Sequence, residues 1–462
     1  MSRNFERTFP QSLLSKVTYA DLILISEWQN EIALRSRSIE TYQNSTKYAV
    51  IRILSREGWG IATTNKLDRE NIGKTVEKAY KMSKTATIPL EKKWGTPIQL
   101  APTKQIKGTY KHPERITPEN ISEEDLTDFL LKIKALQIDT LGPRYGWCEA
   151  VITYRKIKKQ IITCEGTNVT EEKPLTDLVL YTVAKGPYGK LSTASMIEGG
   201  TGGYELILGE NTKKEAIRIA ERAKMLTQAR LLNPMWRGKK LPVILDGEAT
   251  GALIHEAAGH MLEADRLMET KTNIHAIIGS KIGSEELTVI DNPKMLGGYG
   301  SYVVDDEGVI GERKTMIENG IIVNLFHTRW TAAALCEEPN GSARGLTYLP
   351  RSLMSNIYVK PSDWKLKEMV EDIKVGFYLE GLVKAELKGD EIIIEPEIAY
   401  LVEQGEVKVP VKELKIAGKV KRILQAIEGI GRNVTFKPGL EKGNPVSSGA
   451  PHVKISNVHI LN

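Results

Sequence analysis

The chain has 462 residues, which is long enough to form two domains. Of these residues 41% are hydrophobic and 26% are charged, as in ordinary globular proteins. Its net charge of +6 comes from 64 basic and 58 acidic residues spread along the sequence, which argues against a nucleic-acid partner. No apolar stretch approaches the roughly 20 residues that cross a membrane as a helix, so no membrane partner is expected.

The N-terminal residues and the cysteines bear on the cellular compartment. Residues 1–7 carry charges of both signs and lack the apolar core of a secretory signal. The cysteines Cys148, Cys164 and Cys336 lie far apart, which fits neither a disulfide framework nor a cysteine-only zinc site. We therefore expect a cytoplasmic protein with isolated thiols.

The first third of the chain shows the patterns of strands and then of helices. Short apolar or alternating runs predict antiparallel strands at 22–25, 31–37 and 48–54. Asp68 is expected to cap a helix that fades near Thr85. A capping box of Ser122 and Asp125 predicts a second helix with a buried apolar face. The basic run 155–159 lies in an alternating segment and is interpreted as the solvated face of a strand.

A change of character near residue 232 indicates two domains. A capping box at 212–215 predicts a third helix that continues to about Leu231, and an apolar run at 241–245 predicts the first strand of the second domain. Further strands are predicted at 287–290, 321–326, 356–359, 391–394 and 399–402. We predict an α+β fold with an N-terminal α+β domain (1–231), built on an antiparallel sheet with helices, and a β-rich C-terminal domain (232–462).

The strongest chemical signal lies at the start of the second domain. Two of only seven histidines, His255 and His260, lie within six residues, and Glu256 directly follows the first. Neutral imidazoles bind zinc, and a nearby carboxylate can accept a proton from the zinc-bound water, whose pKa falls to about 7 at a three-ligand site. The pattern predicts His255 and His260 as metal ligands and Glu256 as the general base of a peptidase. Three residues of an ordinary helix without metal are the alternative.

The spacing of the two histidines makes a geometric prediction. Side chains five residues apart on an α-helix point about 140° apart, so they cannot share an ion. A local π-turn would bring both imidazoles to one side, and such turns concentrate at functional sites. Gly259, directly before His260, is expected to ease this irregularity of the backbone.

The segment resembles the His-Glu-x-x-x-His signature of the TldD/PmbA family of zinc metallopeptidases, and the resemblance covers nearly the whole chain. It continues through 261–265, with the acidic residues Glu263 and Asp265, and through a list of later segments: 289–293, 305–309, 318–320, 341–344, 354–356 and 445–452. The resemblance implies a TldD-like peptidase that binds Zn²⁺ and cuts unfolded or short peptides in an enclosed cavity. It also implies a homodimer or a heterodimer with a TldE/PmbA-like paralogue.

One departure from the family leaves the third metal ligand open. Catalytic members supply it from a cysteine in a Cys-Gly-Lys segment, whereas residues 438–444 contain no cysteine here. Glu441, Cys336 and His452 are the alternatives, although Glu441 taken alone is expected to be a solvated loop residue. Loss of the cysteine also keeps two other functions open. The chain could be a catalytically silent partner subunit, or a peptide-binding protein without enzymatic activity.

Overall fold

The computed structural model describes residues 9–85 and 99–461, so the expectation about residues 1–7 lies outside the described part. The α-helices of that part are α2 (Gln11–Leu14), α3 (Arg69–Lys84), α5 (Glu123–Leu141), α6 (Glu210–Leu226), α7 (Gly247–Ile254), α8 (Ala264–Glu269), α9 (Arg329–Leu335), α10 (Leu366–Glu371) and α11 (Val420–Gln425). None of the helices in these two ranges has both the length and the apolar character needed to cross a membrane.

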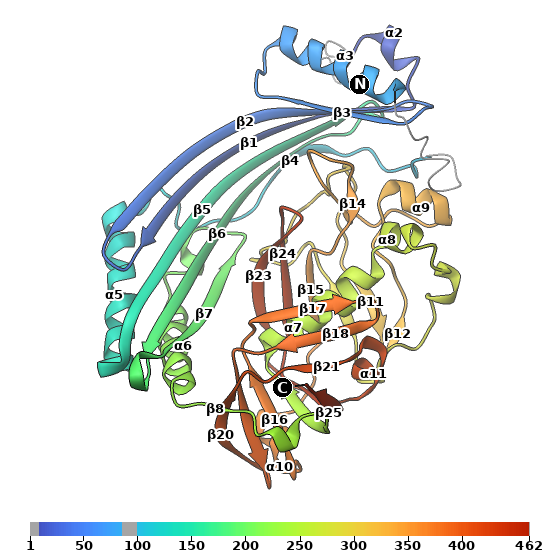
Figure 1. Ribbon diagram of the computed structural model, residues 1–462. Helices are drawn as coiled ribbons and strands as arrows, with labels where there is room; N and C mark the ends of the chain where they lie inside the picture. The colour runs from blue at the N-terminus through green and yellow to red at the C-terminus, as the bar shows by residue number, and fades with distance from the viewer. Residues whose placement is uncertain (1–8, 86–98, 462) are drawn as a thin grey trace.

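The N-terminal part is built on one strongly curved sheet. Its strands are β1 (Tyr19–Leu34), β2 (Ile39–Leu54), β3 (Trp59–Thr64), β4 (Lys107–Lys111), β5 (Tyr145–Thr163), β6 (Asn168–Lys185) and β7 (Leu191–Gly200). They follow the order β3-β2-β1-β5-β6-β4, and β7 also pairs with β6. The long strands β1, β2, β5 and β6 arch over the C-terminal part (Figure 1).

The long strands correct one sequence prediction. The segments 22–25 and 31–37 were expected to be separate strands, but β1 runs without interruption from Tyr19 to Leu34 and pairs with β2 over its whole length. The polar residues in its middle do not end the strand, because continuous antiparallel pairing satisfies their backbone groups. The predicted strand 48–54 lies within β2.

Of the three helices that were predicted in the N-terminal part, two begin at the expected residues. The Asp68 side chain accepts a hydrogen bond from the Asn71 backbone at the start of α3, and the capping box of Ser122 and Asp125 forms at the start of α5. The third prediction is wrong at both ends. Helix α6 begins at Glu210 without a side-chain cap and ends at Leu226, because the residues that follow turn away to form a strand, β8.

The C-terminal part contains two larger sheets and a two-stranded ribbon. A ten-stranded sheet contains β8 (Arg230–Leu231), β9 (Lys240–Leu245), β16 (Val375–Glu380), β17 (Lys384–Lys388), β18 (Glu391–Glu395), β19 (Ile398–Glu403), β20 (Glu406–Lys412), β21 (Ile416–Lys419), β22 (Ile427–Ile430) and β25 (Val453–Ile460). A six-stranded sheet contains β10 (Val289–Asp291), β11 (Lys314–Glu318), β12 (Ile321–Ile322), β15 (Asn356–Val359), β23 (Thr435–Glu441) and β24 (Asn444–Ala450). The ribbon pairs β13 (Ala343–Arg344) with β14 (Arg351–Ser352).

These sheets confirm the α+β class, with an antiparallel sheet in the N-terminal part and a β-rich C-terminal part. One strand prediction was too long, because only Ile321 and Ile322 of the segment 321–326 are in a strand. The domain boundary near residue 232 stays a prediction. The short strand β8, just before that boundary, pairs with β20 of the ten-stranded sheet.

Helix α7 lies in the core that the two C-terminal sheets share. Its Leu253 and Ile254 are fully buried in one cluster with Val243 of β9, Ile357 of β15 and Val446 of β24. Burying such side chains contributes about 1.5–3 kcal/mol each, which fixes the helix against both sheets. The residues that follow α7 are therefore held in a defined position beside the β23–β24 hairpin.

Candidate metal centre

The histidine motif begins where α7 changes its helical form. Asp246 caps α7 by accepting a hydrogen bond from the Ala249 backbone at 2.8 Å, and its second oxygen accepts one from the Gly381 backbone, also at 2.8 Å. The helix then continues into a π-helical turn, His255–Gly259, as the five-residue spacing predicts. The imidazole rings of His255 and His260 lie on one side, with their centroids 4.9 Å apart. This confirms the predicted irregularity.

Gly259 has a different role from the one expected. Its φ of −61° is accessible to any residue, so the turn does not depend on glycine's backbone freedom. A Cβ atom there would instead lie 2.5 Å from the side chain of Met354, which packs directly against the turn. A side chain at position 259 would therefore force the end of the Met354 side chain to move.

Glu441 supplies a third donor next to the two histidines. It ends strand β23, and Lys442 and Gly443 form the tight turn to β24 with φ values of 49° and 75°, as in a two-residue hairpin loop. Its Oε2 atom lies 3.7 Å from Nε2 of His255 and 3.6 Å from Nε2 of His260. The expectation of a solvated loop residue was wrong, because pairing with Asn444 places Glu441 in a strand beside the π-turn.

The other two proposed ligands lie outside this group. Cys336 is an exposed residue at the C-terminal end of α9. His452 is hydrogen-bonded through Nε2 to the hydroxyl of Tyr378, at 3.2 Å. Within the described ranges, His255, His260 and Glu441 form the group whose ligand atoms all lie within 4.8 Å of one another.

The donor set fits zinc. Two imidazole nitrogens and one carboxylate oxygen form a typical catalytic zinc site, which leaves a fourth position open. Zinc holds such atoms at about 2.0–2.1 Å, so that tetrahedral ligands are about 3.3 Å apart. The distances from Glu441 to the two histidines are close to this value. The three residues can therefore hold one ion with small adjustments of their side chains.

A buried carboxylate orients one of the histidines. Nδ1 of His260 lies 2.8 Å from Oε1 of Glu263, whose side chain is 2% exposed. A neutral His260 that donates from Nδ1 keeps the lone pair on Nε2, the atom that faces Glu441. Lys442 of the hairpin turn reaches the same carboxylate at 3.3 Å. The hairpin and the π-turn are thus linked by a second contact besides the candidate ligands.

The charges of the group favour a metal cation. Interaction with His255 and His260 lowers the pKa of Glu441 well below its usual range, so its carboxylate is ionised at neutral pH. Burial lowers the pKa of His260, but Glu263 and Glu441 outweigh it and raise that pKa to about 9. Glu263 and Glu441 therefore stabilise a positive charge at His260. A bound divalent ion can supply that charge in place of a proton.

Glu256 lines the same cavity as His255 and Glu441. A cavity of about 210 Å³ is lined by His255, Glu256 and Glu441 together with Leu382 and Leu440. Among the described residues, no hydrogen bond or ion pair is found for the Glu256 carboxylate. Lys437, which also lines the cavity, is instead paired with Glu248. Glu256 is thus free to exchange a proton with a group in the cavity.

Sequence reasoning missed two residues of this centre. Glu263 appears in the sequence only as part of an acidic pair. Its contact with His260, three residues earlier, forms because the backbone after the π-turn brings the two side chains to the same side. Lys442 contacts Glu263 across 179 positions of sequence. Gly443 indicates a turn after Glu441, but it does not indicate which distant residue Lys442 contacts.

Comparison with known proteins identifies the same family along the chain. Family models match residues 20–83 (PmbA/TldA metallopeptidase domain 1), 116–231 (the central domain) and 238–462 (the C-terminal domain). The chain is 31% identical to a metalloprotease of Methanocaldococcus jannaschii over 93% of both chains. It is 27% identical to a zinc metalloprotease TldD homolog of Saccharolobus solfataricus over 89% of both. The fold matches TldE from Thermococcus kodakarensis with a TM-score of 0.80, at 18% identity over 97% and 98% of the chains.

Proposed function

The chain belongs to the PmbA/TldD family of metallopeptidases, and on that basis we propose that it is a zinc-dependent peptidase that hydrolyses unfolded or short peptides. The observation that carries the proposal is the grouping of His255, His260 and Glu441 beside a cavity that His255, Glu441 and Glu256 line. In this proposal Glu441 acts as the third ligand, in place of the cysteine that the family resemblance implies for catalytic members. The donor set therefore supports a catalytic subunit more than a silent one.

Each residue has a distinct role in this proposal. His255, His260 and Glu441 would hold the zinc, which supplies a Lewis acid and lowers the pKa of a water molecule to about 7. Glu263 fixes the orientation of His260 through its contact at 2.8 Å. Glu256 accepts the proton of the attacking water and returns it to the leaving amine, so one carboxylate acts first as base and then as acid.

The proposed activity is tested with matched substrates. We expect the purified protein to cut an unstructured peptide and to leave a folded domain of the same sequence intact, because hydrolysis requires an extended chain at the cavity. Removing the metal with a chelator should stop cleavage, and adding one equivalent of zinc should restore it. The products are measured by mass spectrometry. Cleavage that continues at full rate without metal would contradict the proposal.

We also propose that the protein acts in the cytoplasm as a dimer, formed with a second copy or with a TldE/PmbA-like paralogue, and that the dimer encloses the candidate site. The likeness of the fold to TldE supports this proposal. The measurement is light scattering at micromolar concentration, for the protein alone and mixed with a paralogue from its own genome. A monomer in both samples would contradict the proposal.

A further inference from the structure

A second cavity lies along the β23–β24 hairpin, and none of the candidate ligands lines it. Its volume is about 220 Å³, and it is lined on one side by strands β1, β2, β5 and β6 of the long sheet. The other side comes from the C-terminal part and includes Tyr302, Arg344, Asn444 and Pro445. Leu440 lines both this cavity and the one at the metal centre, so the two cavities meet at one residue of the hairpin.

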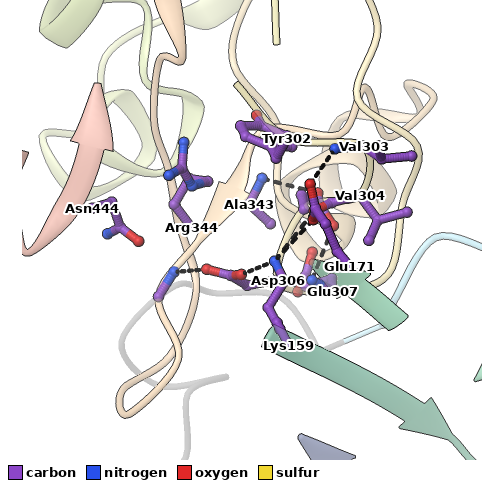
Figure 2. A network of polar contacts seen from close by, with 12 residues as sticks. Lys159, Glu171, Tyr302, Val303, Val304, Asp306, Glu307, Ala343, Arg344 and Asn444 are labelled. Carbon is purple, nitrogen blue, oxygen red and sulfur yellow. Dashed lines mark hydrogen bonds and ion pairs between the residues drawn. The ribbon is translucent and has the colours of Figure 1, made fainter. Parts of the chain in front are cut away.

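The basic run at 155–159 contributes to this cavity, which corrects its interpretation as the solvated face of a strand. Lys156 and Lys158 are exposed, whereas Arg155 and Lys159 point inward from β5. Arg155 pairs with Asp177 at 3.1 Å. Lys159 pairs with Asp306 at 2.8 Å, as Figure 2 shows. These two cations are therefore already neutralised.

Two further cations of the lining have no carboxylate partner among the described residues. Lys173 is 9% exposed, and its Nζ donates to the backbone oxygen of Ser301 at 3.1 Å. Burial lowers the pKa of Lys173 to about 8, and the nearby charge of Glu171 offsets this only in part.

Arg344 is the second such cation and is 5% exposed. Its guanidinium carbon lies 4.5 Å from the ring centre of Tyr302, and Nη2 donates to the Pro445 oxygen at 3.1 Å. Its Nη1 atom is buried without a hydrogen-bond partner. Figure 2 shows Arg344 beside Tyr302, with Asn444 on its other side. A buried cation left with an unused donor is costly, and an anion in the cavity would remove that cost.

The acidic residues of the lining do not supply this anion. Asp306 accepts hydrogen bonds from Lys159 and from the Gly345 backbone. Glu171 lies 2.7 Å from Nε2 of His112 and accepts from the Val303 backbone. Glu27 is the third carboxylate of the lining, and Asp177, which pairs with Arg155, lies outside it. Among the described residues, Lys173 and Arg344 therefore remain the cations of the lining that have no carboxylate within ion-pair distance.

We propose that Arg344 and Lys173 form a subsite for a carboxylate group of the peptide substrate, either its C-terminus or an acidic side chain. The planar guanidinium matches the two oxygens of a carboxylate, and Lys173 adds a second donor. Because the cavity shares Leu440 with the metal centre, one extended peptide can reach both. The inference rests on the proposed peptidase function and gives the peptidase a preference for substrates that place a carboxylate in this cavity.

The test uses peptides that differ only in this carboxylate. One pair carries a free or an amidated C-terminus, and a second series places Glu or Gln at successive positions along the peptide. Binding is measured by fluorescence anisotropy with the zinc-loaded Glu256→Gln protein, so that the readout does not depend on turnover. We expect the carboxylate form to bind about 10- to 100-fold more tightly at one position, as for hydrogen bonds to charged groups. The pair that shows the difference identifies the source of the carboxylate.

Two variants assign that difference to the cavity. Arg344→Gln and Lys173→Met should each reduce the discrimination to about twofold or less. Lys158→Met is the matched control, because Lys158 lies on the exposed face of β5 and pairs with Glu172. Lys173→Met loses only one bond to a backbone oxygen, so it provides the test if Arg344→Gln does not fold.

The outcomes separate this inference from the proposed function. Equal binding of acid and amide forms at every position, or native discrimination in both folded variants, would overturn the subsite while leaving peptidase activity intact. Discrimination without any turnover by the zinc-loaded native protein would support the subsite and contradict the peptidase.

Discussion

Glu256→Gln is expected to lower peptide turnover by about 10²–10⁴-fold while one zinc stays bound, since general-base catalysis commonly contributes a factor of this size. Glu256 lines the cavity with His255 and Glu441 but does not belong to the ligand group. The amide keeps the size of the side chain and removes its ability to accept a proton. The measurement combines the rate of cleavage of an unstructured peptide with the zinc content of the same sample.

The control for this variant is Glu286→Gln, a change at an exposed glutamate away from the cavity. It should cut the peptide at the native rate. If Glu256→Gln cuts as fast as the native protein, Glu256 is not the base. If neither the native protein nor Glu256→Gln cuts the peptide while zinc is fully bound, the chain is a silent partner subunit or a peptide-binding protein.

Loss of any one proposed ligand is expected to remove the metal. Single replacements of His255, His260 or Glu441 by Ala should lower the zinc content from about one per chain to less than a tenth after dialysis, because even changes to residues around the ligands weaken affinity by about 10- to 100-fold. Inductively coupled plasma mass spectrometry measures this content. Circular dichroism shows whether each variant is folded.

Two further variants make the experiment specific. His275→Ala removes an exposed histidine outside the group and should keep full zinc. Glu441→Cys restores the cysteine of the family's catalytic members and should also keep it, since thiolates ligate zinc at about 2.3 Å. Full zinc in Glu441→Ala would show that the third ligand lies elsewhere.

Local patterns in the sequence were sufficient to predict part of the site. The spacing of His255 and His260 predicts a π-turn because an α-helix cannot bring both rings to one side, and the turn is present. The side chain of Asp68 and the Ser122–Asp125 box likewise define the starts of α3 and α5 through hydrogen bonds within a few residues. In each case the interaction that decides the structure lies within one turn of helix.

Contacts between distant segments were not predictable in this way. Glu441 was one of three open candidates, because its approach to the histidines depends on the packing of the β23–β24 hairpin against α7 and not on its neighbours in sequence. The alternation of residues 155–159 shows that β5 has two faces, but not that one face is covered by the C-terminal part. Lys159 was therefore expected from the sequence to be exposed, whereas in the structure it pairs with Asp306.

Zinc K-edge X-ray absorption of the protein purified without added metal tests the central claim most directly. A site made by His255, His260 and Glu441 predicts a first shell of nitrogen and oxygen alone, at about 2.0–2.2 Å, with the scattering pattern of two imidazoles. A sulfur neighbour at about 2.3 Å, or an absence of zinc in active protein, would contradict it.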